Sequence, residues 1–142
     1  MKRKIFVVLL LSLVLSLAIA VNVYAAPAPP LTDLQVYAAC STNHPAYEYF
    51  SSNQFSSVYN HGGGEMYIVT YEIGIGHNRI AKMNGQTLQS VAYQAIDLNG
   101  DTIIDGWIYY WDASAFENGN FTFQCTSLNS PWNTMSDSMY IQ

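Results

Sequence analysis

The sequence predicts an all-β protein, built as a single-domain antiparallel β-sandwich or barrel of about six to seven short strands. Beyond residue 33, short runs of β-branched and aromatic residues alternate with polar residues, which is typical of half-buried strands. Gly and Asn residues that favour turns separate these runs. No helical period extends over more than two turns, so an antiparallel all-β fold is favoured.

In the first half of the chain, residues 34–40 alternate between apolar and polar side chains and predict the first strand. Residues 44–59 are rich in aromatic residues and serine, and predict a short helix or irregular turns. The run 66–75 is the clearest strand candidate of this half. A short strand over 79–83 then leads into an Asn-Gly pair at 84–85, which is typical of a hairpin turn.

In the second half, two expected strands flank an acidic loop. Residues 87–96 lead into this loop and residues 107–112 lead out of it. Residues 121–126 alternate cleanly, with two phenylalanines and Cys125 on one face, and residues 138–141 predict a short last strand. We find no internal repeat, so the strands belong to a single domain.

Residues 1–25 have the features of a secretory signal peptide. They begin with three basic residues, continue with an apolar core over 5–21, and end with small residues before an expected cleavage site after Ala25. A retained membrane anchor is the alternative. The segment 26–33 is rich in Pro and Ala and predicts an extended tether, which favours cleavage and leaves a secreted β-domain at 34–142.

The charge balance excludes two classes of partner. The chain has five basic and ten acidic residues. Without the signal peptide only Arg79 and Lys82 remain basic, and two basic against ten acidic residues give a formal charge of −8. Nucleic acid and anionic membranes both attract clustered Lys and Arg. We therefore expect no nucleic-acid partner and no membrane association after signal cleavage, whereas an acidic secreted domain suits cation binding.

The acidic loop is the one stretch whose residue types and spacing point to a specific chemical role. Its side-chain oxygens fall at loop positions 1, 3, 5 and 9, and a main-chain carbonyl falls at position 7. Hard cations are wrapped by oxygens at this spacing. The sequence thus predicts a calcium site formed by Asp97, Asn99, Asp101, the carbonyl of Ile103 and Asp105.

This loop resembles the calcium loops of EF-hands, dockerins and propeller-type β-hairpins over about ten residues. It departs from the EF-hand pattern at position 6, where Thr102 replaces Gly, and at position 12, where Ile108 replaces Glu. The flanking residues are β-prone, so we expect a hairpin and not a helix-loop-helix. The alternative is an ordinary hairpin loop, because Asp, Asn and Gly are common in any loop.

Two cysteines, Cys40 and Cys125, are widely separated along the chain. In an exported protein, the simplest expectation is one disulfide between them. It would close a loop of about 85 residues and contribute roughly 4 kcal/mol on the chain-entropy model. Two free buried thiols are the alternative.

Three histidines, together with Glu65 and Glu72, are candidates for a metal or acid–base site. They are His44, His61 and His77. Their spacings match no zinc signature, and the glycines after His61 predict a mobile loop because no nucleophile elbow accompanies them. A small secreted hydrolase that uses His77 or His61 with a nearby Glu is nevertheless an alternative function.

A row of aromatic residues follows the acidic loop. Trp107, Tyr109 and Trp111 share one face of their expected strand, and Tyr110 lies on the other. We expect the three to be core residues, because Trp and Tyr bury large areas. If exposed, the same row would be a stacking platform for a sugar chain, and the many tyrosines elsewhere leave a polar aromatic binding surface open.

Four segments of the chain resemble a known family: LTDLQVY at 31–37, STNHPA at 41–46, YWD at 110–112 and NSPWNTMS at 129–136. They are similar to the small secreted proteins of Bacillus typified by YolA and YoaW, over most of the expected mature domain. The resemblance implies export and a single domain. The function of that family is unknown, so the resemblance implies no catalytic residue.

Taken together, these features predict a secreted, calcium-stabilised β-domain with a non-enzymatic binding role. Its expected ligand is an extracellular glycan, cell-envelope material or a protein. The small hydrolase described above is the competing function.

Overall fold

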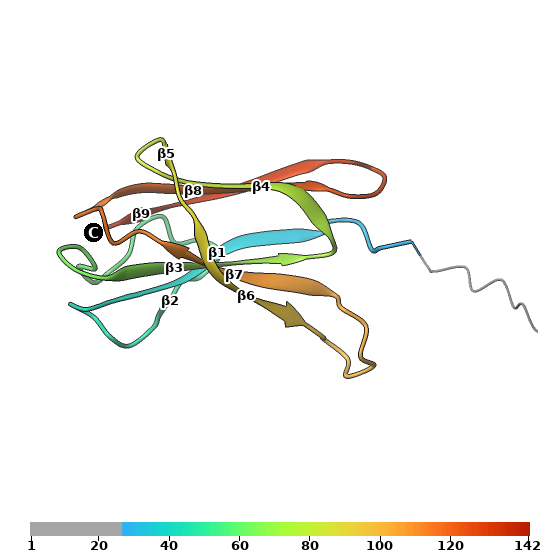
Figure 1. The fold of residues 1–142 in the computed structure, drawn as a ribbon, viewed down its shortest axis with the longest axis horizontal. Helices are drawn as coiled ribbons and strands as arrows, with labels where there is room; N and C mark the ends of the chain where they lie inside the picture. Colours follow the sequence, from blue (N-terminus) through green and yellow to red (C-terminus); the bar gives the residue numbers. More distant parts are fainter. Residues whose placement is uncertain (1–26) are drawn as a thin grey trace, which may run out of the picture.

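The computed structural model describes residues 27–142, so the predicted signal peptide at 1–25 lies outside the described residues. The described chain forms two antiparallel β-sheets that pack against each other (Figure 1). The predicted antiparallel sandwich is confirmed, with seven strands of seven to nine residues and two strands of two residues. Between residues 27 and 142 no helix is long and apolar enough to span a bilayer.

The first sheet has five strands in the order β2-β1-β3-β7-β6, and the second has four in the order β5-β4-β8-β9. We call them the five-stranded and the four-stranded sheet. The strand bounds are β1 Asp33–Ser41, β2 Glu48–Tyr49, β3 Met66–Ile73, β4 Gly76–Met83, β5 Gln86–Thr87, β6 Ser90–Ile96, β7 Gly106–Asp112, β8 Gly119–Ser127 and β9 Thr134–Ile141.

The core lies between the sheets and follows the predicted alternation. On β8, Phe121, Phe123 and Cys125 are fully buried, while the residues between them are exposed or half-buried. Met66 and Ile68 of β3 pack against them from the five-stranded sheet. Burying each large apolar side chain contributes about 1.5–3 kcal/mol. These residues of β3 and β8 therefore contribute much of the stability of the fold.

Some predicted strands differ from the structure at their boundaries, and the strand expected at 87–96 is divided between β5 and β6. The last strand, expected at 138–141, begins at Thr134, because pairing with β8 extends over its polar first half. Residues 44–59 form irregular turns around the two-residue strand β2, without a helix. The hairpin at 84–85 is confirmed, with φ of 51° and 81° at the two turn residues, as a type I′ turn requires.

Residues 29–31, within the segment predicted to be an extended tether, pack against the domain. Leu31 is buried, and its backbone N–H donates to the hydroxyl of Ser127. The backbone N–H of Ile75 donates to the carbonyl of Pro29. The buried leucine and these two hydrogen bonds therefore hold the segment in place, and the packed domain begins before residue 34.

The predicted disulfide is wrong, since Cys40 and Cys125 are both free thiols. A β-bulge between Val36 and Ala38 explains the error. An added residue in a strand reverses which side chains face inward. After the bulge Ala39 faces the core, whereas Cys40 lies on the outer face beside Tyr47. Cys125 stays in the core on β8.

An ion pair joins the two sheets where the chain passes from β3 to β4. Glu72 is fully buried on β3, and its carboxylate accepts two hydrogen bonds from Arg79 of β4, at 2.9 Å from Nε and 2.5 Å from Nη2. The backbone N–H of Gly76 donates to the same carboxylate. The guanidinium also lies 4.9 Å from the centre of the Tyr109 ring. Both oxygens of the buried carboxylate are therefore satisfied.

Breaking this pair from one side should destabilise the fold strongly. We expect Arg79→Met to lower the free energy of unfolding by about 3 kcal/mol or more, because it leaves the Glu72 charge buried without a partner. Lys82→Met, at the exposed basic residue of the same strand, is the matched control and should change stability by less than about 0.5 kcal/mol. Urea denaturation measures both. Equal effects from the two variants would contradict a structural role for the pair.

Candidate functional site

The outer face of the five-stranded sheet carries a cluster of tyrosines over an apolar floor. We call it the tyrosine face. The floor is formed by Ala38, Val69 and Ile108, which are cross-strand neighbours or lie on adjacent strands. Five tyrosines from four strands and the segment before β2 surround and extend it: Tyr37, Tyr47, Tyr49, Tyr71 and Tyr110.

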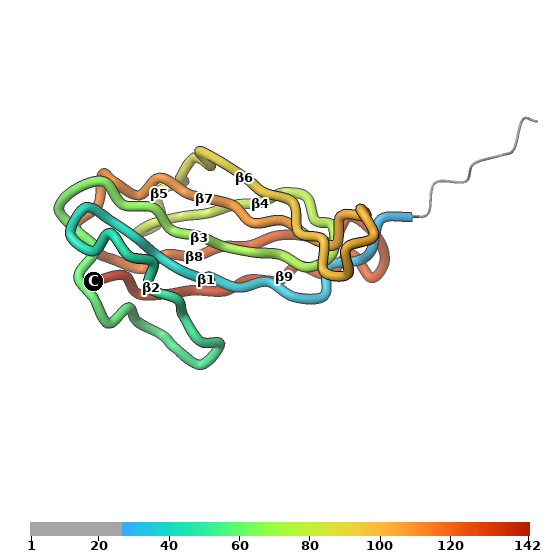
Figure 2. Tube along the Cα trace, turned by 90° about the horizontal axis from the view of Figure 1, so that it is seen from below, coloured from blue at the N-terminus to red at the C-terminus, as the bar shows by residue number. Residues whose placement is uncertain are grey.

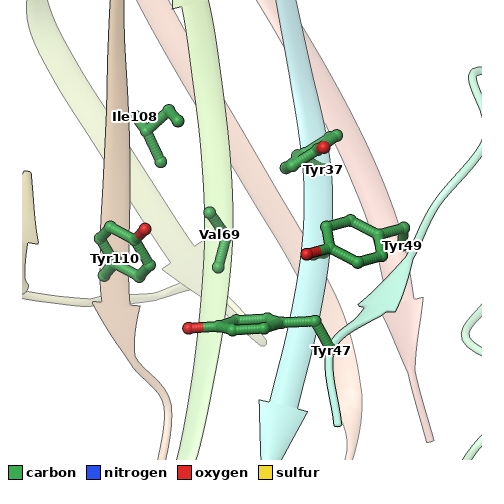
Figure 3. A pocket seen from close by; sticks show the side chains of 7 residues that line it. Tyr37, Tyr47, Tyr49, Val69, Ile108 and Tyr110 are labelled. Atoms are coloured by element: carbon green, nitrogen blue, oxygen red, sulfur yellow. The ribbon is translucent and has the colours of Figure 1, made fainter. Parts of the chain in front are cut away.

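The rings of four of these tyrosines form a connected set. The centre of the Tyr37 ring lies 5.2 Å from that of Tyr49 and 5.7 Å from that of Tyr71, both edge to face. Tyr47 lies 6.0 Å from Tyr49. Figure 3 shows Tyr47 reaching from the segment before β2 across β1, with its hydroxyl over β3 and directed toward the side of Tyr110. The β1 bulge lies at Tyr37, so the same irregularity that moved Cys40 outward shapes this face.

The hollow between these rings is shallow. Its volume is about 70 Å³, whereas pockets that enclose small ligands measure roughly 300–1,000 Å³. A ligand would therefore lie across the rings and not inside a cavity. Exposed fractions of 45% for Tyr47 and 61% for Tyr49 leave much of these two side chains available for contact.

The hydroxyls of Tyr47 and Tyr71 stay protonated at neutral pH. Burial raises the pKa of Tyr71 to about 12, and its hydrogen bond to Asp33 acts in the same direction. Burial also raises the pKa of Tyr47, with a contribution from the neighbouring thiol of Cys40. Each hydroxyl can then both donate and accept. The residues that line the hollow are all uncharged, so the face combines aromatic stacking with neutral hydrogen bonding.

The row of aromatic residues on β7 faces the opposite sheet, but the prediction that all three are core residues holds only for Trp111. Trp111 is buried, and its indole N–H donates to the hydroxyl of Thr70 at 2.9 Å. Trp107 and Tyr109 are only half-buried, because the four-stranded sheet does not cover them fully. Tyr93 of β6 packs edge-on against Trp107, with ring centres 5.6 Å apart. The three rings of β7 therefore divide into one core residue and two groove residues.

The acidic loop connects β6 to β7, as predicted, and projects at the end of the molecule where β1 begins (Figure 2). The carboxylate of Asp97 accepts hydrogen bonds from the backbone N–H groups of Asn99, Gly100 and Thr102. The hydrogen bond from Thr102 lowers the pKa of Asp97, burial opposes this, and the hydrogen bond from Gly100 adds to it. The loop is thus wrapped around its first carboxylate.

Other predicted ligands of the loop bond to one another and to its backbone. Asp101 accepts from the N–H of Ile103, and Asp105 accepts from the N–H of Leu98. The oxygens of this loop are the ligand type that calcium prefers. Within residues 27–142, however, no three acidic, His or Cys side chains converge into a ready-made metal cluster. The structure brings the five predicted residues into one loop but not into a closed coordination shell.

Thr102 has a φ of 70°, in the left-handed region that β-branched residues rarely adopt. It occupies position 6, where EF-hand loops use Gly for a sharp turn. The turn is therefore made here despite the unfavourable residue.

The three histidines do not all meet: the rings of His44 and His61 lie 5.6 Å apart, edge to face, but His77 lies elsewhere. His61 is fully buried, and its Nε2 lies 2.9 Å from Oε2 of Glu48. His44 stacks on Tyr59, with ring centres 4.0 Å apart. His77 lies on β4, so it belongs to the four-stranded sheet. The predicted partners of the histidines were Glu65 and Glu72, but the carboxylate beside His61 belongs to Glu48. The pairing of Glu48 with His61 was missed because the two residues are thirteen positions apart in an irregular part of the chain.

Glu48 organises the irregular segment that follows β2. Its carboxylate accepts hydrogen bonds from the N–H groups of Val58 and Tyr59 and contacts His61. Burial raises its pKa, but these hydrogen bonds outweigh burial and lower the pKa below the ordinary value of 4.5. The ionised form of Glu48 therefore stabilises the fold.

This arrangement predicts a loss of stability in acid. A carboxyl group whose pKa is lower in the folded than in the unfolded state contributes stability above its unfolded pKa. That contribution disappears as the pH falls from about 4.5 through the lower folded value. Glu48→Gln should lower stability at pH 7 by about 1–3 kcal/mol and flatten the pH dependence in this range. Denaturation midpoints measured across pH test this, with Glu65→Gln as the exposed control. Parallel pH profiles for wild type and Glu48→Gln would contradict it.

Comparison with known proteins assigns the chain to a family. No match was found among curated proteins. The family model described as a domain of unknown function (DUF4879) matches residues 26–141, nearly all of the chain beyond the predicted signal peptide. This agrees with the expectation of a family whose function is unknown. The chain therefore belongs to the DUF4879 family.

Proposed function

We propose that the protein is a secreted, non-enzymatic binding domain that holds a neutral glycan across its tyrosine face. The observation that carries the proposal is the set of five tyrosines around the floor of Ala38, Val69 and Ile108. Aromatic rings present flat apolar surfaces, and their hydroxyls supply polar ends. Sugar rings have the matching character, with apolar C–H faces and a rim of hydroxyl groups.

The negative charge of the chain favours an uncharged glycan. The formal charge of the chain is −5, and the two basic residues among residues 27–142 lie on β4 in the other sheet. An anionic polymer would meet repulsion and no cation on the tyrosine face. The shallow shape of the hollow favours a chain lying across several rings. A neutral oligosaccharide or the glycan strands of a cell envelope fit both conditions.

Removing one ring from the centre of the face should weaken glycan binding. We expect Tyr110→Ala and Tyr47→Ala each to lower affinity about tenfold or more, which corresponds to about 1.4 kcal/mol. Tyr110→Phe keeps the stacking surface and should lose less. Tyr140→Ala, on the exposed side of β9 in the other sheet, is the matched control. Calorimetry with neutral glucose and N-acetylglucosamine oligosaccharides, and co-sedimentation with purified peptidoglycan, measure the effect.

The outcomes separate the glycan from other ligands. Affinity for a neutral oligosaccharide that falls in the two alanine variants but not in Tyr140→Ala supports the proposal. Binding to none of these glycans, or binding that the alanine variants leave unchanged, would overturn it.

Export is part of the same proposal. The signal-peptide features of residues 1–25 and the resemblance to small secreted Bacillus proteins both support it. An exported domain would meet cell-envelope glycan and extracellular proteins first. A protein ligand is the alternative within this proposal, because an aromatic face without charge also suits protein contacts.

Calcium binding by the acidic loop is the other part of the proposal. Five oxygen ligands at the expected spacing support it, as does the sharp turn at Thr102. Asp97, Asn99, Asp101, the carbonyl of Ile103 and Asp105 would hold the ion. The side chains of Asp101 and Asp105 would rotate toward Asp97 to complete the shell. Bound calcium would supply positive charge that fixes the β6–β7 hairpin.

A thermal melt with calcium and with chelator tests this part. Calcium at about 100 times its dissociation constant should stabilise the fold by roughly 2.7 kcal/mol. Asp101→Ala should abolish both this shift and calorimetric calcium binding, while Glu65→Gln, an exposed acidic residue outside the loop, should retain both. No shift in the wild type would identify the loop as an ordinary hairpin turn.

The competing hydrolase has one observation in its favour, which is the close pair of His61 and Glu48. Three facts weigh against it. The His61 side chain is fully buried, its Nδ1 has no hydrogen-bond partner among the described residues, and the nearby hydroxyl of Ser57 already donates to the carbonyl of Tyr59. A general base needs access to substrate and a reacting group within reach. We therefore favour a structural role for this pair.

A further inference from the structure

The strand β6 forms an open edge of the five-stranded sheet. It pairs with β7 on one side, and no strand of residues 27–142 pairs with its other side. Figures 1 and 2 both show β6 along the border of the molecule. Six of its seven residues are exposed. Alternate residues of such a strand direct their backbone N–H and C=O groups outward, available to another strand.

The other edges of the two sheets are protected or short. β2 and β5 have two residues each. The free side of β9 is covered near its end by residues 55–57, where the N–H of Ser57 donates to the carbonyl of Tyr140 and the N–H of Tyr140 donates to the carbonyl of Phe55. In the middle of β9, the carboxylate of Asp137 accepts a hydrogen bond from the N–H of Val36 on β1. Among the described strands, β6 is thus the long edge without a contact of this kind.

The sequence of β6, SVAYQAI, has none of the usual devices that block edge pairing. Native edges carry charged residues, proline or a pronounced bulge. β6 contains no charged residue and no proline, and its single irregularity lies near its start, between Ser90 and Ala92. The edge is therefore suited to pairing with a further strand.

The inward-facing side of β6 also lacks cover. Val91 and Tyr93 are 55% and 69% exposed, because the four-stranded sheet does not extend over them. Tyr93 borders a groove of about 290 Å³ that is walled by Trp107 and Tyr109 and closed by Arg79. An apolar strand face beside an aromatic groove would gain from burial.

We infer that β6 pairs antiparallel with β6 of a second copy of this chain, joining two five-stranded sheets into one ten-stranded sheet. Full overlap of residues 90–96 places Tyr93 opposite its own counterpart on the two-fold axis. Ala92 then lies opposite Gln94, and Val91 lies opposite Ala95. Such a contact is self-complementary, as a two-fold interface must be.

Charge argues for a second copy as the partner. Each chain is acidic, with a formal charge of −5, so two copies repel wherever acidic surfaces meet. β6 is the edge at which neither copy carries charge. The acidic loop begins directly after Ile96, and antiparallel pairing places the two loops at opposite ends of the interface. Parallel pairing would bring them together.

The contact is small and therefore weak. One seven-residue strand pair lies at the low end of specific interfaces, so we expect a reversible dimer with a dissociation constant roughly in the micromolar range. A two-fold axis perpendicular to the sheet keeps both tyrosine faces on the same side. The inference does not depend on the proposed glycan binding, because it rests on β6 alone.

Sedimentation velocity of the purified protein from low micromolar to millimolar concentration tests the inference. The wild type should shift from monomer to dimer, more readily at high salt because salt screens the acidic repulsion. Tyr93→Lys places like charges on the axis and should move dimerisation at least tenfold up in concentration. Tyr140→Lys, on the covered β9 edge, should behave like the wild type.

Complementary charges test the register. Ala92→Lys and Gln94→Glu should each weaken self-association, and an equimolar mixture of the two variants should form heterodimers, because the new charges then face each other. This result stands even if Tyr93→Lys disturbs the local packing, which circular dichroism and melting would reveal. A wild type that remains monomeric throughout, or a mixture that fails to associate more than either variant alone, would overturn the inference.

Discussion

The ion pair between Glu72 and Arg79 is the constraint on which the arrangement of the two sheets depends. It spans the point where the chain leaves the five-stranded sheet and enters the four-stranded sheet. A carboxylate buried this deeply is tolerated only with a well-placed cation and full hydrogen bonding. Arg79 also lies over the ring of Tyr109, so the ion pair links β4 to β7 beside the half-covered groove next to β6.

Local pattern was sufficient to predict the strands but not the direction of every side chain. The alternation around Phe121 and Phe123 predicted both the strand and its buried face, because β8 is regular. β1 has an equally clear alternation, yet a single bulge near Tyr37 reverses its second half. A bulge is stabilised by contacts with neighbouring strands, and these contacts are not visible in a short stretch of sequence. The disulfide prediction failed for this reason.

The two candidate sites differ in the same way: one could be located from a local stretch of sequence, and the other could not. The acidic loop is a local motif, so its residues were found together and lie in one hairpin connection. The tyrosine face is assembled from β1, β2, β3, β7 and the irregular segment before β2. Nothing in the spacing of Tyr37, Tyr47 and Tyr110 shows that they meet. A surplus of tyrosines was the available signal, and it predicted a polar aromatic surface without locating it.

The position of the two basic residues has a consequence for resistance to proteolysis. Trypsin-like proteases cut only after Lys or Arg, and within residues 27–142 these are Arg79 and Lys82. Both lie on β4, where Lys82 is paired with β5 on one side and β8 on the other, and Arg79 lies in the irregularity of the β4–β8 pairing between His77 and Ile80. Proteases need an extended, unpaired stretch of chain, and paired strands open rarely. The Arg79 side chain is further engaged by Glu72. The folded domain should therefore resist this class of protease.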